Sequence, residues 1–152
     1  MPSAAFSMSV KMKISAEALL LDTHVWIWLV RGQDRMSKDI LELMFAAAGA
    51  GAMFLSVMSI WELSLLDAKR RITLNMPCLT WVCTALERSG ALTVPLTPDI
   101  AVTCHQLPGR LHGDPVDRVL VATARSENLT LVTRDRAILD YAAQGHVRAL
   151  PC

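Results

Sequence analysis

The sequence has few charged residues and almost no excess of either sign. Only 19% of its 152 residues are Asp, Glu, Lys or Arg, against roughly 25% in ordinary soluble domains. Fifteen basic and 14 acidic residues leave a formal net charge of +1. This balance excludes a generally polycationic nucleic-acid binder and a chain with a strongly acidic tail.

The sequence also lacks the cysteine patterns of a disulfide framework or a zinc ribbon. None of its four cysteines forms a CxxC pair, and no signal peptide precedes them. We therefore expect reduced cytosolic thiols that form neither a disulfide framework nor a zinc site. The cysteines are Cys78, Cys83, Cys104 and Cys152.

No segment has the pattern of a leader or a membrane span. Residues 1–17 contain no continuous apolar run, and the apolar stretch 18–30 is short and is interrupted by Asp22 and His24. We therefore expect a cytoplasmic protein without a membrane segment. Residues 1–17 are expected to be a disordered lead-in or an over-called start, and residues 18–152 a single domain.

Hydrophobic residues, in contrast, are abundant. They make up 53% of the sequence, which argues against disorder and for a compact body. A chain of this length buries about 70% of its unfolded surface in one core. Together with the low charge content, the composition predicts an apolar surface that is covered by a partner.

Short apolar runs alternate with longer amphipathic segments along the chain. Helical patterns of up to about a dozen residues separate the short runs, and this alternation is typical of parallel strands joined by right-handed crossovers. The sequence therefore predicts a three-layer α/β/α domain with a central, mainly parallel sheet. The expected strands are 18–21, 52–55, 92–94, 129–132 and 147–150. The expected helices are 24–30 after the capping residue Asp22, 38–48 capped by Ser37, 56–71 opened by Ser56, 77–90 with Pro77 as its first residue, 99–107, 114–127 and 136–143.

Acidic side chains follow several of these expected strands. Asp22 comes directly after the first, Asp135 lies three residues beyond Val132, and Glu62 lies in the second turn of the helix after the second. Asp114 and Asp117 open another helix and share one face of its first turn. Ligands of open parallel sheets bind beyond the carboxyl ends of the strands, so these acids are candidate functional residues.

Three of these acids also have a purely structural interpretation. Asp22, Asp114 and Asp135 all precede expected helices, where an aspartate is a favourable N-cap. Glu62 is harder to explain in this way, because it lies between apolar residues inside a helix, where an unpaired carboxylate is costly.

Four or five acids at one sheet edge would repel each other and raise their own pKa values unless a cation compensates. Mg²⁺, or Mn²⁺ in its place, prefers such oxygen ligands and is usually shared with a substrate phosphate. This chemistry suits phosphodiester hydrolysis. The four histidines are scattered and Cys104-His105 is no metal-ligand spacing, so we expect the histidines to lie elsewhere, and His112→Ala to leave activity unchanged.

Four segments carry a family resemblance, in this order and spacing. They are LLDTHVWIWL at 20–29, LSVMSIWE at 55–62, HGDPVDRVLVATA at 112–124 and LTLVTRD at 129–135. With them the sequence resembles the PIN-domain ribonucleases, in particular the toxins of bacterial toxin–antitoxin pairs of the VapC kind. The resemblance covers 19–150, nearly the whole chain.

The resemblance implies a Mg²⁺-dependent endoribonuclease with a three-layer PIN-like fold. Asp22, Glu62 and Asp117 match the three family acids, and Asp135 matches the more variable fourth. These four are the catalytic and metal-binding residues that the resemblance implies. Asp114 then caps a helix or holds an outer-shell water.

Other residues near the matched motifs have implied roles. Thr23 and Thr133 match small hydroxyl positions that orient carboxylates. Arg118, Arg134 and Arg136 lie beside the acids and either contact RNA phosphates or are solvated charges paired with neighbouring acids. Trp26, Trp28 and Trp61 are more typical of core or interface positions than of base-stacking platforms. Trp26 and Trp28 are two apart in an expected helix, so they should point in different directions, and one of them is expected to meet a dimer mate or partner.

The resemblance further implies an RNA substrate, a homodimer and an antitoxin that lays a segment into an apolar groove. Three alternatives stay open. A stand-alone RNA-processing nuclease would use the same site. A phospho-aspartate phosphoryl-transfer domain would use Asp22 as nucleophile, although the haloacid-dehalogenase pattern has an aspartate where this chain has His24. A binding module would keep the fold without the catalysis.

Overall fold

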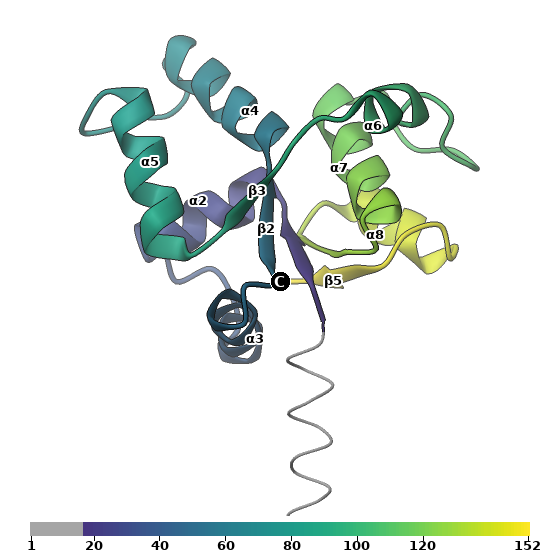
Figure 1. Cartoon of the computed structure of the whole chain (residues 1–152), viewed down its shortest axis with the longest axis horizontal. Helices are drawn as coiled ribbons and strands as arrows, with labels where there is room; N and C mark the ends of the chain where they lie inside the picture. Colours follow the sequence, from purple (N-terminus) through teal and green to yellow (C-terminus); the bar gives the residue numbers. More distant parts are fainter. Residues whose placement is uncertain (1–16) are drawn as a thin grey trace, which may run out of the picture.

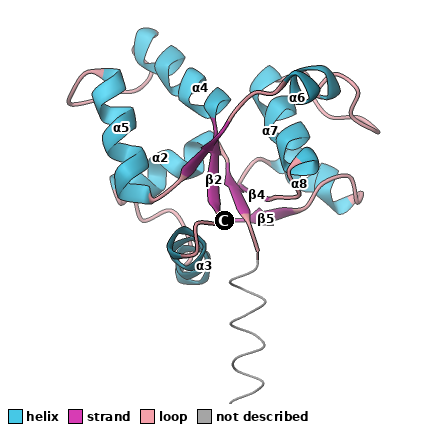
Figure 2. Cartoon of the chain, viewed as in Figure 1, coloured by secondary structure: helices cyan, strands magenta, loops and turns pink. Residues whose placement is uncertain are grey.

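The structure, a computed structural model, describes residues 17–152. A central sheet of five parallel strands is covered by helices on both faces (Figures 1 and 2), which confirms the predicted three-layer α/β/α fold. The prediction of a lead-in over residues 1–17 falls, apart from Glu17, outside the described residues. The hydroxyl of Thr130 donates to the carboxylate of Glu17, at the start of the described chain.

The sheet has the strand order β3-β2-β1-β4-β5, and every neighbouring pair is parallel. The chain therefore moves outward from β1 to β2 and β3, and then crosses back to place β4 and β5 on the other side of β1. The order reverses between β1 and β4, and such a switch point opens a crevice at the carboxyl ends of the strands. The strands are β1 Leu19–Leu21, β2 Met53–Ser56, β3 Leu92–Val94, β4 Thr130–Thr133 and β5 Ala149–Pro151.

The helices fall into two groups on either side of the sheet in Figure 1, α2 to α5 on one side and α6 to α8 on the other. Their bounds are α2 Thr23–Arg31, α3 Lys38–Gly49, α4 Val57–Ala68, α5 Cys78–Ser89, α6 Pro98–Thr103, α7 Pro115–Ser126 and α8 Arg136–Ala143. Most agree with the predicted segments to within two residues. The predicted helix to Leu107 is wrong at its end, because α6 stops at Thr103 and residues 104–114 form a loop.

The central strands are buried on both faces, and their side chains alternate between two cores. Leu19 and Leu21 of β1 pack with α2, α3 and α5, whereas Leu20 between them packs with α7 and α8. All three are fully buried. This two-sided burial explains why the strand reads as a continuous apolar run in the sequence.

Several predicted helix caps are confirmed. The side chains of Asp22, Ser37 and Ser56 accept hydrogen bonds from backbone N–H groups at the starts of α2, α3 and α4. Pro77 is the N-cap of α5 and not, as predicted, its first helical residue. Because each cap satisfies a donor that the helix itself leaves unpaired, these short-range patterns fix where the helices begin.

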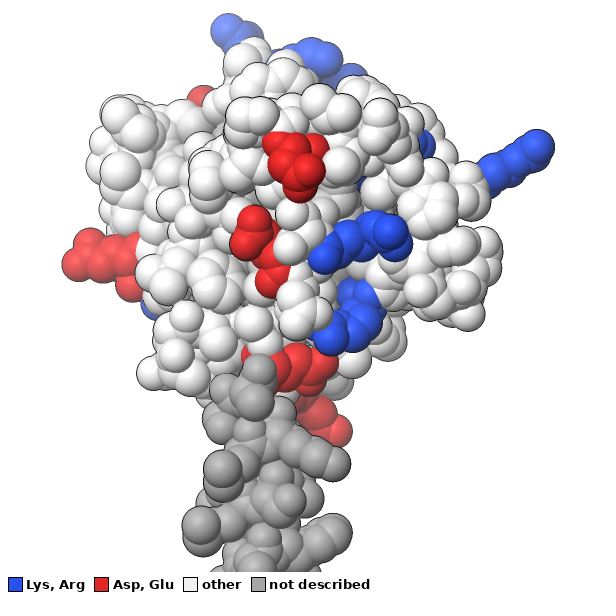
Figure 3. All heavy atoms as spheres, turned by 45° about the vertical axis from the view of Figure 1, so that its right-hand side comes forward, with Lys and Arg blue, Asp and Glu red and all other residues white. Residues whose placement is uncertain are grey.

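Two further predictions concern the cysteines and the membrane. All four cysteines are free thiols. Within residues 17–152, none of the helices has both the length and the apolarity of a bilayer-spanning segment. Charged side chains are sparse and mixed in sign over the face in Figure 3, in keeping with the low charge content of the sequence.

Candidate metal centre

A cleft of about 330 Å³ opens at the carboxyl ends of the strands, where the sheet order reverses. The acids of this cleft come from segments far apart in the sequence, and the parallel arrangement of the strands brings them together. All five predicted acids line it: Asp22, Glu62, Asp114, Asp117 and Asp135.

Asp22 follows β1 directly and is only 9% exposed. Its Oδ1 accepts a 2.7 Å hydrogen bond from the backbone N–H of Thr23, and its Oδ2 accepts a 2.7 Å bond from the hydroxyl of Thr133. Burial raises the pKa of Asp22, and these two bonds partly offset the rise. Asp22 is therefore both the N-cap of α2 and a residue that lines the cleft, so its structural role is compatible with the predicted functional one.

Asp114 and Asp117 open α7. Oδ1 of Asp114 accepts from the backbone N–H groups of Val116 and Asp117, which confirms Asp114 as the N-cap of this helix. Asp117 projects from the first turn and is mostly buried. Burial, followed by the charges of Asp114 and the other three acids, raises the pKa of Asp117 to about 8.

Glu62 lies in the second turn of α4 and is half-buried. Burial raises its pKa, the charges of Asp22 and Asp114 raise it further, and Thr23 and His24 partly oppose the shift. The hydroxyl of Thr23 donates to Oγ of Ser59 at 2.8 Å, between two fully buried residues. Thr23 thus ties α2 to α4, and the two helices that carry Asp22 and Glu62 are held side by side.

Asp135 caps α8, where its Oδ1 accepts from the backbone N–H of Ile138 at 3.0 Å. Its own N–H donates to the hydroxyl oxygen of Thr133 at 3.0 Å. The same hydroxyl donates to Asp22, so Thr133 joins two of the predicted acids through one oxygen atom. These two hydrogen bonds hold the Asp22 side chain and the Asp135 backbone next to each other at the carboxyl edge of the sheet.

His112 is the residue of this site that the sequence analysis missed. Its Nε2 lies 3.2 Å from Oδ2 of Asp117 and 3.8 Å from Oδ1 of Asp135. The expectation that the histidines lie away from the acids is therefore wrong for His112, and also for His24, which lines the cleft. The signal that could have found His112 was its place in the segment of Asp114 and Asp117, two residues before the N-cap of α7.

The three predicted arginines have different surroundings. Arg134 lines the cleft, where its guanidinium carbon lies 4.7 Å from the centre of the Trp28 ring and its Nε donates to the Cys152 carbonyl. Arg136 is exposed at the start of α8. Arg118 is not among the residues that line the cleft, and it donates to backbone carbonyls of the loop before α7.

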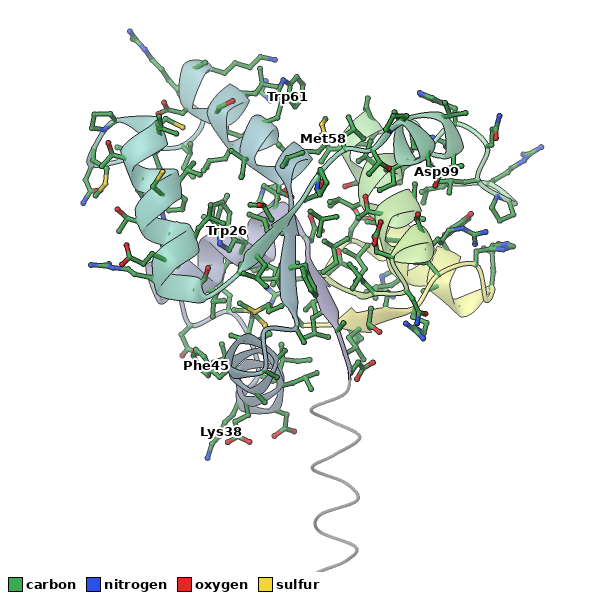
Figure 4. All side chains as sticks on the ribbon, viewed as in Figure 1. Trp26, Lys38, Phe45, Met58, Trp61 and Asp99 are labelled. Carbon is green, nitrogen blue, oxygen red and sulfur yellow. The ribbon has the colours of Figure 1, made fainter. Side chains whose placement is uncertain are left out.

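The two tryptophans of α2 also have different surroundings. Trp26 is fully buried, packs edge-on against Trp81 with ring centres 5.5 Å apart, and donates to Ser89. Figure 4 shows it between α2 and α5. Trp28, two residues on, lies on the cleft wall. The prediction that the two point in different directions is confirmed, and Trp26 is a core residue.

The donor set fits a hard divalent cation. Five carboxyl groups line one small cleft, and burial together with the charges of the other four acids raises the pKa of Asp117. A cation removes that repulsion, and carboxylate oxygens are the ligands that Mg²⁺ and Mn²⁺ prefer. Among the described residues, three side chains could together bind an ion: Asp117, Asp135 and His112. Each offers one ligand atom, and the three atoms lie within 4.8 Å of one another.

The chain is similar to known proteins over most of its length. The family description "PIN domain" matches residues 19–144. The chain is 35% identical over 123 residues to Ribonuclease VapC22 of Mycobacterium tuberculosis, a match that covers 81% of this chain and 91% of that protein.

Three solved structures share the fold. The VapBC2 complex of Rickettsia felis bound to promoter DNA has a TM-score of 0.64 at 16% identity, covering 89% of this chain and 98% of that one. DNA-bound VapBC of Salmonella typhimurium gives 0.62 at 17%, over 89% and 98% of the two chains. FitAcB of Neisseria gonorrhoeae gives 0.60 at 22%, over 87% and 96%. At these identities the likeness concerns the fold.

Proposed function

The chain belongs to the PIN-domain family, and on that premise we propose that it is a divalent-metal-dependent endoribonuclease, the toxin of a toxin–antitoxin pair. The observation that carries the proposal is the convergence of five carboxyl groups on one cleft, with the pKa of Asp117 raised to about 8 by burial and by its acidic neighbours. A protein gains little from such repulsion unless a cation belongs there.

In this proposal Asp22, Asp117, Glu62 and Asp135 hold Mg²⁺ or Mn²⁺. When bound, the ion lowers the pKa of a water and polarises the scissile phosphate. Thr133 orients Asp22 through its 2.7 Å bond. Asp114 fixes the first turn of α7, from which Asp117 projects.

Arg134 is the arginine that we assign to the RNA. Its guanidinium lies against the Trp28 ring on the wall of the acidic cleft, and backbone carbonyls of Arg35 and Cys152 accept its hydrogen bonds. A positive group in this position attracts a phosphate next to the scissile one. Arg136, exposed at the start of α8, extends the same path.

A protein partner is supported by large apolar side chains that the described chain leaves exposed. Leu79 is 74%, Phe45 63% and Trp61 52% exposed. Figure 4 shows Phe45 on α3 and Trp61 on α4, away from the sheet. The names of the similar proteins point to an antitoxin, and a second copy of the chain is the other partner that we propose.

The phospho-aspartate alternative is not favoured by the surroundings of Asp22. A nucleophile needs a free oxygen that a substrate can reach, whereas both carboxylate oxygens of Asp22 accept hydrogen bonds in a buried position. A stand-alone RNA-processing nuclease would use the same acids. Co-purification with the product of a small neighbouring gene distinguishes it from a toxin.

The proposal is tested by cleavage of a structured RNA with the purified full chain. We expect cleavage with Mg²⁺ or Mn²⁺, none in EDTA, and loss of at least a hundredfold in Asp22→Asn and Asp117→Asn, about 3 kcal/mol of barrier. Asp140→Asn, an exposed acid of α8 outside the cleft, is the matched control and should keep full activity. Equal cleavage in EDTA, or full activity of Asp117→Asn, would contradict the metal mechanism, and a chain inactive under all conditions would favour the binding module.

A further inference from the structure

The loop of residues 104–114, between α6 and α7, is fastened to the body of the protein. Arg118 donates from Nε to the carbonyl of Cys104 at 2.9 Å and from Nη1 to that of Leu111 at 3.1 Å. The hydroxyl of Tyr141, a buried residue of α8, donates to the carbonyl of Pro108. The loop is therefore held from two different helices, although it has no regular secondary structure.

A close approach at Gly109 fixes the same loop. Gly109 has a positive φ of 67°, and a side chain there would lie only 2.8 Å from Nε2 of His146. The backbone thus passes directly over a histidine that itself packs on the Tyr141 ring, with centres 4.7 Å apart. These contacts set the path of the loop, and with it the place of His112 above the acids.

The two ring nitrogens of His112 face different groups. The backbone N–H of Asp114 donates to Nδ1 at 3.2 Å. Nδ1 therefore uses its lone pair, and the neutral ring carries its proton on Nε2. Nε2 points at the carboxylates of Asp117 and Asp135, at 3.2 Å and 3.8 Å, and is itself fully buried.

Nε2 has no formed hydrogen bond within the described part of the chain. The distance of 3.2 Å from Nε2 to Oδ2 of Asp117 is short enough for a hydrogen bond, but the two groups are not aligned for it. A buried donor without a partner is costly, so a small rotation of the Asp117 carboxylate toward His112 is favourable. The proton of His112 is thus available to one oxygen of either acid.

On this geometry, and resting on the metal-dependent function proposed above, we propose that His112 is a positioning residue: its Nε2–H holds the carboxylate of Asp117, the nearer of the two acids, for the metal, and His112 is not a metal ligand. Ligation through Nε2 would require the proton to move to Nδ1. That shift would place two protons between Nδ1 and the Asp114 nitrogen and would break the bond that orients the ring.

Holding one carboxylate oxygen leaves the other free to face the ion. Hydrogen bonds of this outer kind typically contribute about 10–100-fold to metal affinity. His112→Leu removes the donor at similar volume and should weaken Mn²⁺ binding by about that factor. His112→Gln, which can place an amide N–H near the former Nε2, should bind Mn²⁺ within about threefold of the wild-type chain.

The experiment measures binding of Mn²⁺ alone to the full chain, by calorimetry and by pulsed electron paramagnetic resonance. The expected spectrum shows no nitrogen of His112 directly coordinated to Mn²⁺. Nitrogen-15 spectra of the wild-type chain with Mg²⁺ should keep the Nε2–H tautomer of His112. His105→Leu, an exposed histidine of the same loop, is the matched control and should bind Mn²⁺ as the wild type does.

A directly coordinated nitrogen that disappears in His112→Gln would overturn the proposal, as would unchanged Mn²⁺ affinity in a folded His112→Leu. If His112→Leu does not fold, the wild-type spectra still decide between donor and ligand. Absence of any Mn²⁺ binding to the wild type would overturn the metal-dependent function and this proposal with it, whereas Mn²⁺ coordinated through His112 would overturn this proposal alone.

Discussion

The hydroxyl of Thr133 donates a 2.7 Å hydrogen bond to Oδ2 of Asp22, across 111 residues of sequence. The bond exists because β1 and β4 are parallel neighbours in which Leu21 pairs with Val132, so that the residues after each strand end lie side by side. It places Asp22, the first of the five acids of the cleft, at the point where the sheet order reverses.

Thr133→Val should destabilise the protein and weaken metal binding. The substitution leaves a buried carboxylate oxygen without its donor, and a hydrogen bond to a charged group contributes about 1.5–3 kcal/mol. We expect a loss of that size in urea unfolding. Thr130→Val is the matched control, because Thr130 lies in the same strand but bonds to Glu17. It should leave Mn²⁺ affinity unchanged, and equal effects of both variants on affinity would contradict the role of Thr133.

The metal-free protein should lose stability as pH rises from about 4 to about 8. The pKa of Asp117 is raised to about 8 in the folded chain from an ordinary value near 4, by burial first and by its acidic neighbours next. Between these values the folded chain holds a proton that the unfolded chain has released, so the free energy of unfolding falls with rising pH. Asp22 and Glu62 shift in the same direction.

Urea unfolding in EDTA at pH 5, 6.5 and 8 measures this trend. Asp117→Asn is the comparison, because it cannot titrate and should show a clearly shallower slope. A wild-type slope equal to that of Asp117→Asn would contradict the raised pKa. Asp140→Asn should retain the wild-type slope.

Asp117→Asn should stabilise the metal-free protein at pH 8 while it removes nuclease activity. The neutral amide ends the repulsion with four nearby carboxylates, and the same change removes a metal ligand of the proposed site. Thermal unfolding in EDTA should therefore show a higher Tm for the variant. A lower Tm would mean that the carboxylate, even without metal, is favourable in the fold.

Adding metal should make the wild-type chain more stable than Asp117→Asn. At about 100 times its dissociation constant, an ion that binds only the folded state adds about 2.7 kcal/mol of stability. The wild-type chain should gain that much with Mn²⁺ at pH 8, and Asp117→Asn much less. Equal gains in both chains would place the ion elsewhere.

Arg134→Gln should raise the KM for RNA with little effect on Mn²⁺ affinity. Its guanidinium lies against Trp28 on the cleft wall, and loss of a phosphate contact lowers substrate affinity in a salt-dependent way. Lys38→Gln is the control, since Lys38 projects from α3 at the bottom of Figure 4, away from the carboxyl ends of the strands. A KM that is unchanged in Arg134→Gln at low salt would contradict the assignment.

Trp26→Ala should cost about 3–5 kcal/mol of stability, because it empties a fully buried site between α2 and α5. Trp61→Ala, at a side chain that is 52% exposed, should change the free energy of unfolding by about 0.5 kcal/mol or less. Urea unfolding of the two variants provides the measurement. If both lost the same stability, the packing of Trp26 against Trp81 would not be a main contributor to the core.

The sequence by itself determined the elements and most of the acids. Continuous apolar runs such as 19–21 are what a strand buried on both faces requires, and caps such as Ser37 depend on atoms only a few residues away. Asp22 and Asp135 were candidates for the same reason, because the residue after a parallel strand must lie at the ligand-binding edge.

Tertiary structure alone decided the place of His112, the surroundings of Arg118 and which of Trp26 and Trp28 is the core residue. Each depends on contacts between segments that no local pattern specifies. The loop path that brings His112 to Asp117 is set by Arg118 and by Tyr141 of another helix. A sequence pattern records which side chains follow a strand or open a helix, whereas the packing of distant elements determines which of those side chains meet.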